Sequence, residues 1–282
     1  MRVRAGLLAV SSFVVLAGCS HTELRVVRSF DNGPQSGSPR MIAYTHHALS
    51  SDAGPWGVYV FDLDSSSTHV LATDSWAYAW IPGTDSLLMR WSMAPLPRVI
   101  SARTGLGRTL AIDVWPGSIS PDHQWIASTG SADAGGGFRP TVTLQSFATG
   151  EIHDITPDSM TYAGPSWSPS GDRLAVAGGS AREPGIFIID SNGTPLRRIV
   201  EHVGDVDGPL WSPRGDLVAW GDVRGLHVVD TLGTGERFVA TGGEACWEPD
   251  GDALVYVTKD RDGSDRLFEY RLSTGRTRQL TH

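Results

Sequence analysis

The chain has 282 residues, with 23 Lys and Arg against 31 Asp and Glu, a formal net charge of -8, and two cysteines, Cys19 and Cys246. This length suits one large domain with a substantial core. The acidic balance, with Lys259 as the single lysine, argues against nucleic acid as a partner and against electrostatic binding to anionic lipid.

The N-terminal residues have the pattern of a secretory signal. A basic start precedes the apolar run Ala5–Ala17, which is too short to span a bilayer. The segment Leu16-Ala17-Gly18-Cys19 resembles the lipobox of bacterial lipoproteins, in which the cysteine sulfur is diacylated. We therefore expect a signal peptide over 1–18, acylation at Cys19, a tether over 19–23 and one domain over 24–282. The alternative is an ordinary signal peptide followed by a cysteine by chance.

If Cys19 carries lipid, Cys246 has no disulfide partner. It directly precedes Trp247 in an apolar context. We expect it to be a buried, inert thiol.

One short phrase recurs along the rest of the chain. The segments Trp167–Gly171, Trp211–Gly215 and Trp247–Gly251 read WSPSG, WSPRG and WEPDG, and an apolar run follows each. Proline presets φ for a tight turn, and glycine permits the positive φ that closes a hairpin. An apolar run after the turn is typical of a strand covered on both faces.

The turn prolines divide the chain into six units, spaced by 43, 39, 48, 44 and 36 residues. Periods near forty are typical of four-stranded propeller blades. The turn prolines are Pro39, Pro82, Pro121, Pro169, Pro213 and Pro249.

The pattern predicts an all-β fold, a six-bladed β-propeller of four-stranded antiparallel blades. In chain order, the third strands are expected at Val58–Leu63, Arg98–Ser101, Val142–Phe147, Ile186–Asp190, Leu226–Asp230 and Leu267–Leu272. Because Arg276–Leu280 already supplies a fourth strand for the last blade, Leu24–Phe30 is expected to be the innermost strand of the first.

The phrase resembles the WD40-like repeat of TolB-type β-propellers, close to Pro-x-Trp-Ser-Pro-Asp-Gly. The resemblance implies a propeller alone, without the α/β domain that precedes it in TolB. Two units depart from the pattern: Ile119 and His123 stand where tryptophan and glycine are expected, and both residues are missing around Pro39.

The repeat residues are expected to be structural, with each tryptophan filling the space between blades. The alternative is that aromatic surfaces stack a ligand. The positions are Trp80, Pro82, Pro121, Trp167, Pro169, Gly171, Trp211, Pro213, Gly215, Trp247, Pro249 and Gly251.

Catalytic and metal-binding patterns are scarce. The sequence has no Gly-x-Ser-x-Gly, His-Glu-x-x-His or Cys-x-x-Cys. His46 and His47 are adjacent, so on a strand they point to opposite faces and would not easily share one metal. Asp260–Asp265 is acidic but is better explained as a turn than as a calcium loop. We expect no catalytic residues, no metal and no cofactor.

Three long loops are expected at Thr45–Gly57, Arg90–Pro97 and Thr129–Pro140. They join second to third strands, on the same face of the disc as the connections between blades; we call this the long-loop face. Long loops on a rigid scaffold often carry recognition, and aromatics with arginine are typical of interface hot spots. The candidate partner-binding residues are Trp56, Trp91, Arg139, Trp76, Tyr78, Trp115, Tyr162 and Arg182. The alternative is that the glycine-rich Ser131–Gly137 is merely mobile.

The leading hypothesis is a lipid-anchored, extracytoplasmic, non-catalytic scaffold of the cell envelope. It would act as a monomer, touch the membrane through its acyl anchor alone, and bind an envelope protein or cell-wall component. An alternative is a carbohydrate-binding or sugar-cleaving propeller, in which Asp205, Asp207 and Glu244 converge at the mouth of the central channel. A third is an accessory subunit of a transporter or secretion system.

Overall fold

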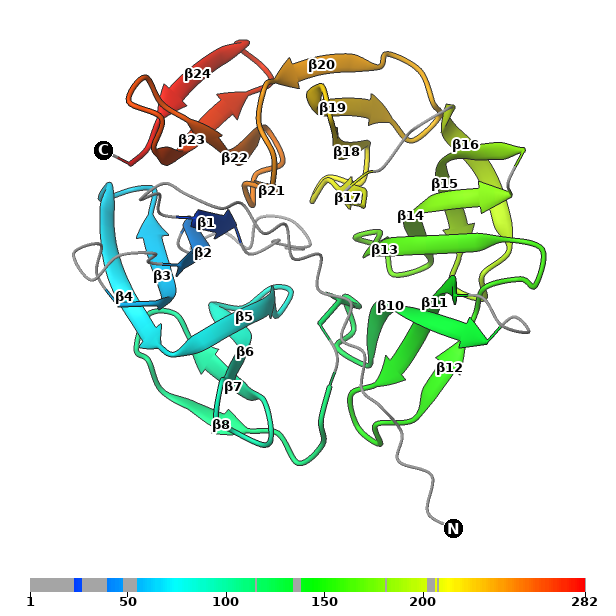
Figure 1. Cartoon of the computed structure of the whole chain (residues 1–282), viewed down its shortest axis with the longest axis horizontal. Helices are drawn as coiled ribbons and strands as arrows, with labels where there is room; N and C mark the ends of the chain where they lie inside the picture. Colours follow the sequence, from blue (N-terminus) through cyan, green and yellow to red (C-terminus); the bar gives the residue numbers. More distant parts are fainter. Residues whose placement is uncertain are drawn as a thin grey trace.

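The computed structural model describes residues 23–26, 40–47, 55–114, 116–133, 138–180, 182–201, 206 and 208–281. These residues form six four-stranded antiparallel sheets arranged as the blades of a propeller (Figure 1). None of them belongs to a helix with the length and apolar character that crossing a membrane requires. The predicted all-β, six-bladed fold is confirmed.

Every blade is built from four strands that are consecutive in the chain. Blade one contains β1 (Glu23–Val26), β2 (Met41–His47), β3 (Gly57–Asp62) and β4 (Ser67–Thr73). Blade two contains β5 (Ser75–Trp80), β6 (Ser86–Trp91), β7 (Arg98–Ser101) and β8 (Gly107–Thr109). Blade three contains β9 (Ser118–Ile119), β10 (Trp125–Asp133), β11 (Phe138–Ser146) and β12 (Ile152–Asp154). Blade four contains β13 (Thr161–Trp167), β14 (Arg173–Ser180), β15 (Glu183–Asp190) and β16 (Pro195–Glu201). Blade five contains β17 (Leu210–Trp211), β18 (Leu217–Asp222), β19 (Gly225–Asp230) and β20 (Arg237–Ala240). Blade six contains β21 (Ala245–Trp247), β22 (Ala253–Lys259), β23 (Asp265–Arg271) and β24 (Arg276–Gln279).

The inner place of blade one is filled from the N-terminal side of the chain, as the strand count predicts. Strand β1 pairs antiparallel with β2, from Glu23 opposite His47 to Val26 opposite Tyr44. It spans Glu23–Val26, whereas the sequence predicted Leu24–Phe30, of which residues 27–30 lie outside the described part. Blades one and six are neighbours around the disc (Figure 1).

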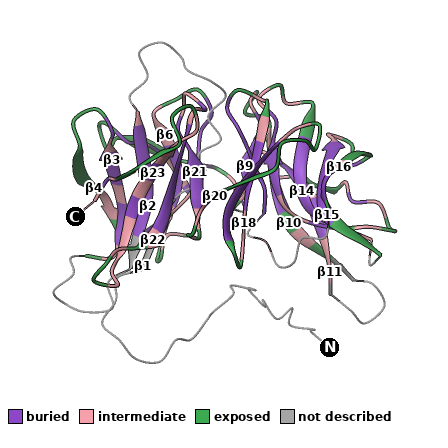
Figure 2. Cartoon of the chain, turned by 90° about the horizontal axis from the view of Figure 1, so that it is seen from above, coloured by how far each residue is buried: buried purple, intermediate pink, exposed green. Residues whose placement is uncertain are grey.

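The core consists of apolar clusters between neighbouring blades. The strand interiors are buried, and exposed residues gather in turns and outer strands (Figure 2). The four repeat tryptophans Trp80, Trp167, Trp211 and Trp247 are all at most 6% exposed. Cys246 is also buried as a free thiol, and burial raises its pKa well above the usual range.

The tight turns after the inner strands touch the turns of the preceding blades. Gly171 and Gly215 have φ of 76° and 80°, and a Cβ there would lie 3.4–3.7 Å from Pro121 and Pro169, respectively. At the corresponding place in blade three, His123 adopts φ of 59°, and its Nε2 lies 2.8 Å from the Pro82 carbonyl oxygen. Its side chain therefore bridges to blade two, which glycine could not do.

Among the described strands, none of blade six pairs with a strand of blade one, and side chains pack across the seam between them. Ile42, Tyr44 and Phe61 of blade one share an apolar cluster with Val255 and Leu267 of blade six. At one end of this seam, Arg40 Nη2 donates to Glu248 Oε2 at 2.5 Å. Glu248 stands where Ser168 and Ser212 stand in blades four and five, so the repeat of blade six places a carboxyl group at this seam.

The loop between β10 and β11 is shorter than the sequence predicts. Thr129–Pro140 was expected to be a loop, but Thr129 pairs with Val142 and the ladder continues to Asp133 opposite Phe138. Polar and small residues in this stretch hid the pairing, because the two strands extend beyond the apolar core. Likewise, β2 continues through His47, within the predicted loop Thr45–Gly57.

Candidate functional site

The structure separates the predicted partner-binding residues into two groups on the long-loop face. One group lies at blades one and two, and the other at blades three and four. Trp115 lies outside the described residues. The first group contains Trp56, Trp76, Tyr78 and Trp91, and the second contains Arg139, Tyr162 and Arg182.

Backbone hydrogen bonds bring the tryptophans of the first group together. The Asp74 N–H donates to the Trp56 carbonyl oxygen at 3.0 Å, and the Ser92 N–H donates to the Asp74 carbonyl oxygen at 2.9 Å. These bonds tie the start of β3, the β4–β5 connection and the end of β6. The rings of Trp56 and Trp76 meet edge to face with centroids 4.8 Å apart.

Polar partners surround the aromatic rings of blade two. Arg98 stacks over Trp91, 5.2 Å from the ring centroid, and Arg90 Nη1 donates to Asp113 Oδ1 at 2.8 Å. Burial raises the pKa of Tyr78, against the opposing effect of Arg90. The cation–π contact and the ion pair hold this aromatic surface in a fixed shape.

Met93 is an exposed apolar residue next to Ser92, which bonds to the β4–β5 connection, and it was missed from the sequence. It lies two residues after Trp91, in the β6–β7 loop, and is 94% exposed, while Trp76 is 38% exposed. We call Trp56, Trp76 and Met93 the tryptophan patch; Trp91 lies opposite Ser75, packs against the apolar cluster of blades one and two, and is not part of it. A single methionine in a loop gives no sequence signal for a binding site. Only its exposure in the structure makes Met93 a candidate partner-binding residue.

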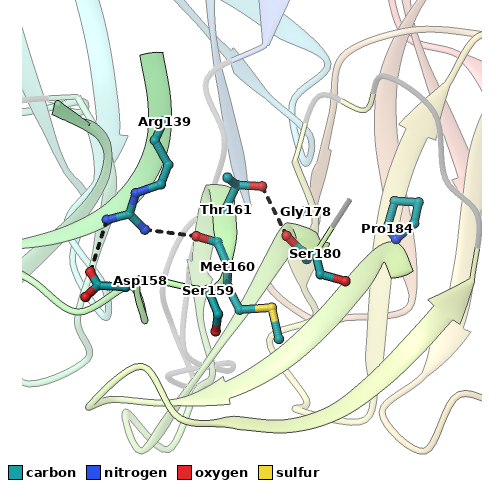
Figure 3. Close-up of a pocket in the computed structure, with 9 residues that line it drawn as sticks. Arg139, Asp158, Ser159, Met160, Thr161, Gly178, Ser180 and Pro184 are labelled. Atoms are coloured by element: carbon teal, nitrogen blue, oxygen red, sulfur yellow. Dashed lines mark hydrogen bonds and ion pairs between the residues drawn. The ribbon is translucent and has the colours of Figure 1, made fainter. Parts of the chain in front are cut away.

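Arg139 of the second group lines a shallow pocket of about 340 Å³ between blades three and four (Figure 3). Arg139 donates to the carbonyl oxygens of Pro157 and Met160 at 3.2 and 3.0 Å, and lies 3.7 Å from Asp158. Its guanidinium is thus used to hold the β12–β13 connection. The prediction that Arg139 contacts a partner remains a prediction, but substituting it would also disturb the fold.

Tyr162 does not belong to a binding surface, which corrects the prediction. Its side chain is fully buried and packs against Phe187 with ring centroids 5.7 Å apart. The residue lies near the start of β13, where its ring turns into the core between blades instead of toward solvent. Arg182, by contrast, is exposed in the turn between β14 and β15.

The predicted carboxylate site at the channel mouth falls largely outside the described part, which lacks Asp205 and Asp207; Glu244 lies on the β20–β21 connection. Burial raises the pKa of Glu248, against the effect of Arg40. It belongs to the seam described above, with Arg271 Nη2 at 3.3 Å.

Two segments were considered as metal sites from the sequence and judged unfavourable, and the structure describes both. His46 and His47 lie on β2, and Asp260 Oδ1 accepts from the N–H groups of Asp262 and Ser264 at 3.0 and 3.3 Å. The acidic segment is therefore closed as a turn by its own backbone. In the described residues, no group of three or more His, Cys, Asp or Glu side chains could hold a metal ion.

The fold and the site define a class: a six-bladed propeller of four-stranded blades that displays an aromatic patch on its long-loop face. The model of the TolB beta propeller domain family matches residues 108–281. The chain belongs to this family.

Solved structures agree in fold. TolB from Acinetobacter baumannii is 17% identical to this chain, with a TM-score of 0.64. The match covers 93% of this chain and 64% of that TolB, so this chain spans less than two thirds of the length of that TolB. A protein described as TolB from Agrobacterium tumefaciens is 19% identical (TM-score 0.63; 86% and 89% covered). An oligogalacturonate lyase in complex with manganese is 14% identical (TM-score 0.57; 92% and 78% covered). At such identities the likeness is one of fold.

Proposed function

We propose that the protein is a lipid-anchored, extracytoplasmic propeller that binds an envelope protein through the tryptophan patch. Membership of the TolB propeller family supports a protein-binding scaffold of the envelope. The observation that carries the proposal is the Trp56–Trp76 pair, with Trp76 exposed, next to a loop that exposes Met93 and is bonded through Ser92 to the residue Asp74. Tryptophan and methionine are enriched at protein interfaces. Acylation at Cys19, which lies outside the described residues, would hold the disc at a membrane.

Substituting the patch should weaken partner binding without unfolding the disc. We expect Trp76→Ala and Met93→Ala each to lower affinity by about 1 kcal/mol or more, because each removes an exposed anchor. The measurement is the yield of photo-crosslinked partner from membranes, compared at matched protein levels. A photo-crosslinker is needed because Lys259 is the single lysine of the chain.

Leu232→Ala is the matched control, because Leu232 is 62% exposed in the β19–β20 turn on the opposite face. It should leave the crosslinked yield unchanged. If Leu232→Ala reduces the yield and the patch variants do not, the binding site is on the other face of the disc.

The anchor is tested separately. Cys19→Ala should release the protein from the membrane pellet into the soluble fraction, because a single lost thiol removes the acyl attachment. The check is fractionation at high salt, followed by mass measurement of the N-terminal peptide. Retention of the variant in the pellet would contradict the lipid anchor. The role of the tryptophan patch is decided by the crosslinking experiment.

The runner-up function is carbohydrate binding or cleavage at the channel mouth, supported by the fold likeness to oligogalacturonate lyase and by the placement of Glu244 between blades five and six. It predicts that Glu244→Gln abolishes binding or cleavage of acidic oligosaccharides and that patch variants do not. Measuring both variants on such oligosaccharides separates the two functions.

A further inference from the structure

The outer edge of blade one differs from the outer edges of the other blades. Strand β4 is the last strand of its sheet, so one side of its backbone has no strand partner. It is seven residues long and contains no Lys, Arg, Asp, Glu or Pro. Proteins usually protect such edges with charges, proline or short length.

The five other outer strands carry that protection. Strands β8, β12, β20 and β24 have three or four residues and each contains a charged side chain. Strand β16 also has seven residues but begins with Pro195 and includes Arg197 and Arg198. Antiparallel pairing of any of these edges with its own copy would bring charged side chains of the same kind close together, which is unfavourable.

The edge of β4 is accessible along its regular part. Residues Ser67 to Val70 are exposed, and Val70 is 45% exposed. The pairing with β3 is interrupted at Leu71, between Val58 opposite Ala72 and Tyr59 opposite Val70. The four residues before this bulge therefore form the usable ladder.

A neighbouring turn widens this surface. His69 Nε2 lies 3.0 Å from the Ala102 carbonyl oxygen of blade two, so the turn after β7 lies against β4. This turn includes Leu106, which is 74% exposed.

Charged residues flank both ends of β4: Asp74 follows one end, and Asp62, Asp64 and Arg103 lie near the other. Asp74 is exposed directly after the strand. Near the other end, Asp62 of β3 pairs with Ser67 of β4. The Ser65 N–H lowers the pKa of the Asp62 carboxyl group, and the exposed Arg103 lies close enough to lower that pKa as well. An antiparallel copy would therefore bring Asp74 of one molecule to the end where Arg103 of the other lies.

We propose that β4 is a self-association edge, which pairs antiparallel with β4 of a second copy over Ser67–Val70. Main-chain hydrogen bonds between the two edges would provide the attraction, as in other cases of strand addition. The uncharged side chains and the complementary Asp74 and Arg103 permit this pairing. The sequence predicted a monomer; this edge predicts a weak dimer, because a short strand and one turn offer less surface than a standard interface.

The test is sedimentation velocity of the purified full chain over a concentration series. We expect reversible dimerisation with a dissociation constant between about 10 µM and 1 mM, typical of a small interface. Val70→Lys should weaken dimerisation at least about tenfold, because it adds an ammonium group to each copy of an edge strand that otherwise has no Lys, Arg, Asp or Glu. Arg103→Glu should weaken it by a smaller factor and serves as the second variant if Val70→Lys disturbs folding.

Leu196→Lys is the matched control, since Leu196 is 52% exposed on the outer strand β16. It should dimerise like the unmodified protein. The proposal is overturned if the unmodified protein stays monomeric throughout the series. It is also overturned if both β4-edge variants dimerise normally, or if Leu196→Lys is as damaging as they are.

Discussion

Replacing Trp247 with alanine should lower the free energy of unfolding by about 3–5 kcal/mol, the range for deleting a large buried aromatic side chain. Trp247 is fully buried and shares a cluster with Leu210 and Ala219 of blade five and Leu254 of blade six. Its Nε1 also donates to the Leu210 carbonyl oxygen at 3.1 Å. The substitution would thus leave a void between two blades and remove a buried hydrogen bond.

Denaturant unfolding, followed by circular dichroism, measures this loss. Trp76→Ala is the control within the same residue type, because Trp76 is 38% exposed and its removal should cost far less. A Trp247→Ala protein of unchanged stability would show that the repeat tryptophan does not support the blade interface.

Replacing Arg40 with alanine should destabilise the closed disc by about 1.5–3 kcal/mol, the range for a hydrogen bond to a charged group. The Glu248 side chain that it contacts is fully buried. Arg271 remains at 3.3 Å, so we expect a smaller loss than for a buried charge left with no partner. Thermal and denaturant unfolding both report this change.

The loss should depend on pH. Burial already raises the folded-state pKa of Glu248, and removing Arg40 raises it further. A carboxyl group with a raised folded pKa favours folding below its unfolded pKa, and this contribution is lost as the pH rises through the folded pKa. The Arg40→Ala defect should therefore be larger at pH 7 than near pH 4.

Lys259→Ala is the control for the seam, because it removes a surface ion pair. Lys259 pairs with Asp265, and the Lys259 side chain is 60% exposed. Such surface pairs contribute little. A pH-independent Arg40→Ala defect, or one matched by Lys259→Ala, would contradict a special role for the buried seam carboxylate.

The blade count could be predicted because each repeat encodes its own turn. Proline and glycine at Pro169 and Gly171 leave few alternatives to a tight hairpin, and three turns have this chemistry. The turn at Pro121 was predicted, but the conformation of His123 was not, because a non-glycine residue with positive φ is uncommon. Its ring contact with Pro82 involves residues 41 positions apart and has no local signature.

The candidate site was predicted only in part, because exposure depends on packing between blades. Tyr162 and Trp76 both lie near the starts of inner strands, yet one is buried and the other exposed. Local pattern cannot distinguish them, since what covers Tyr162 is Phe187 on β15 and the neighbouring blade. The Arg40–Glu248 contact also escaped prediction, because its partners are 208 residues apart.

The consecutive-strand construction of every blade bears on how the chain folds. All strand pairing takes place within about forty residues, so each blade can form from local contacts and stabilise the next, as in other repeat architectures. The contacts between blades six and one are different, because they bring together the two ends of nearly the whole chain and carry the largest loop-closure entropy. We therefore expect the six-to-one seam to form last during folding and to open first when the native disc fluctuates.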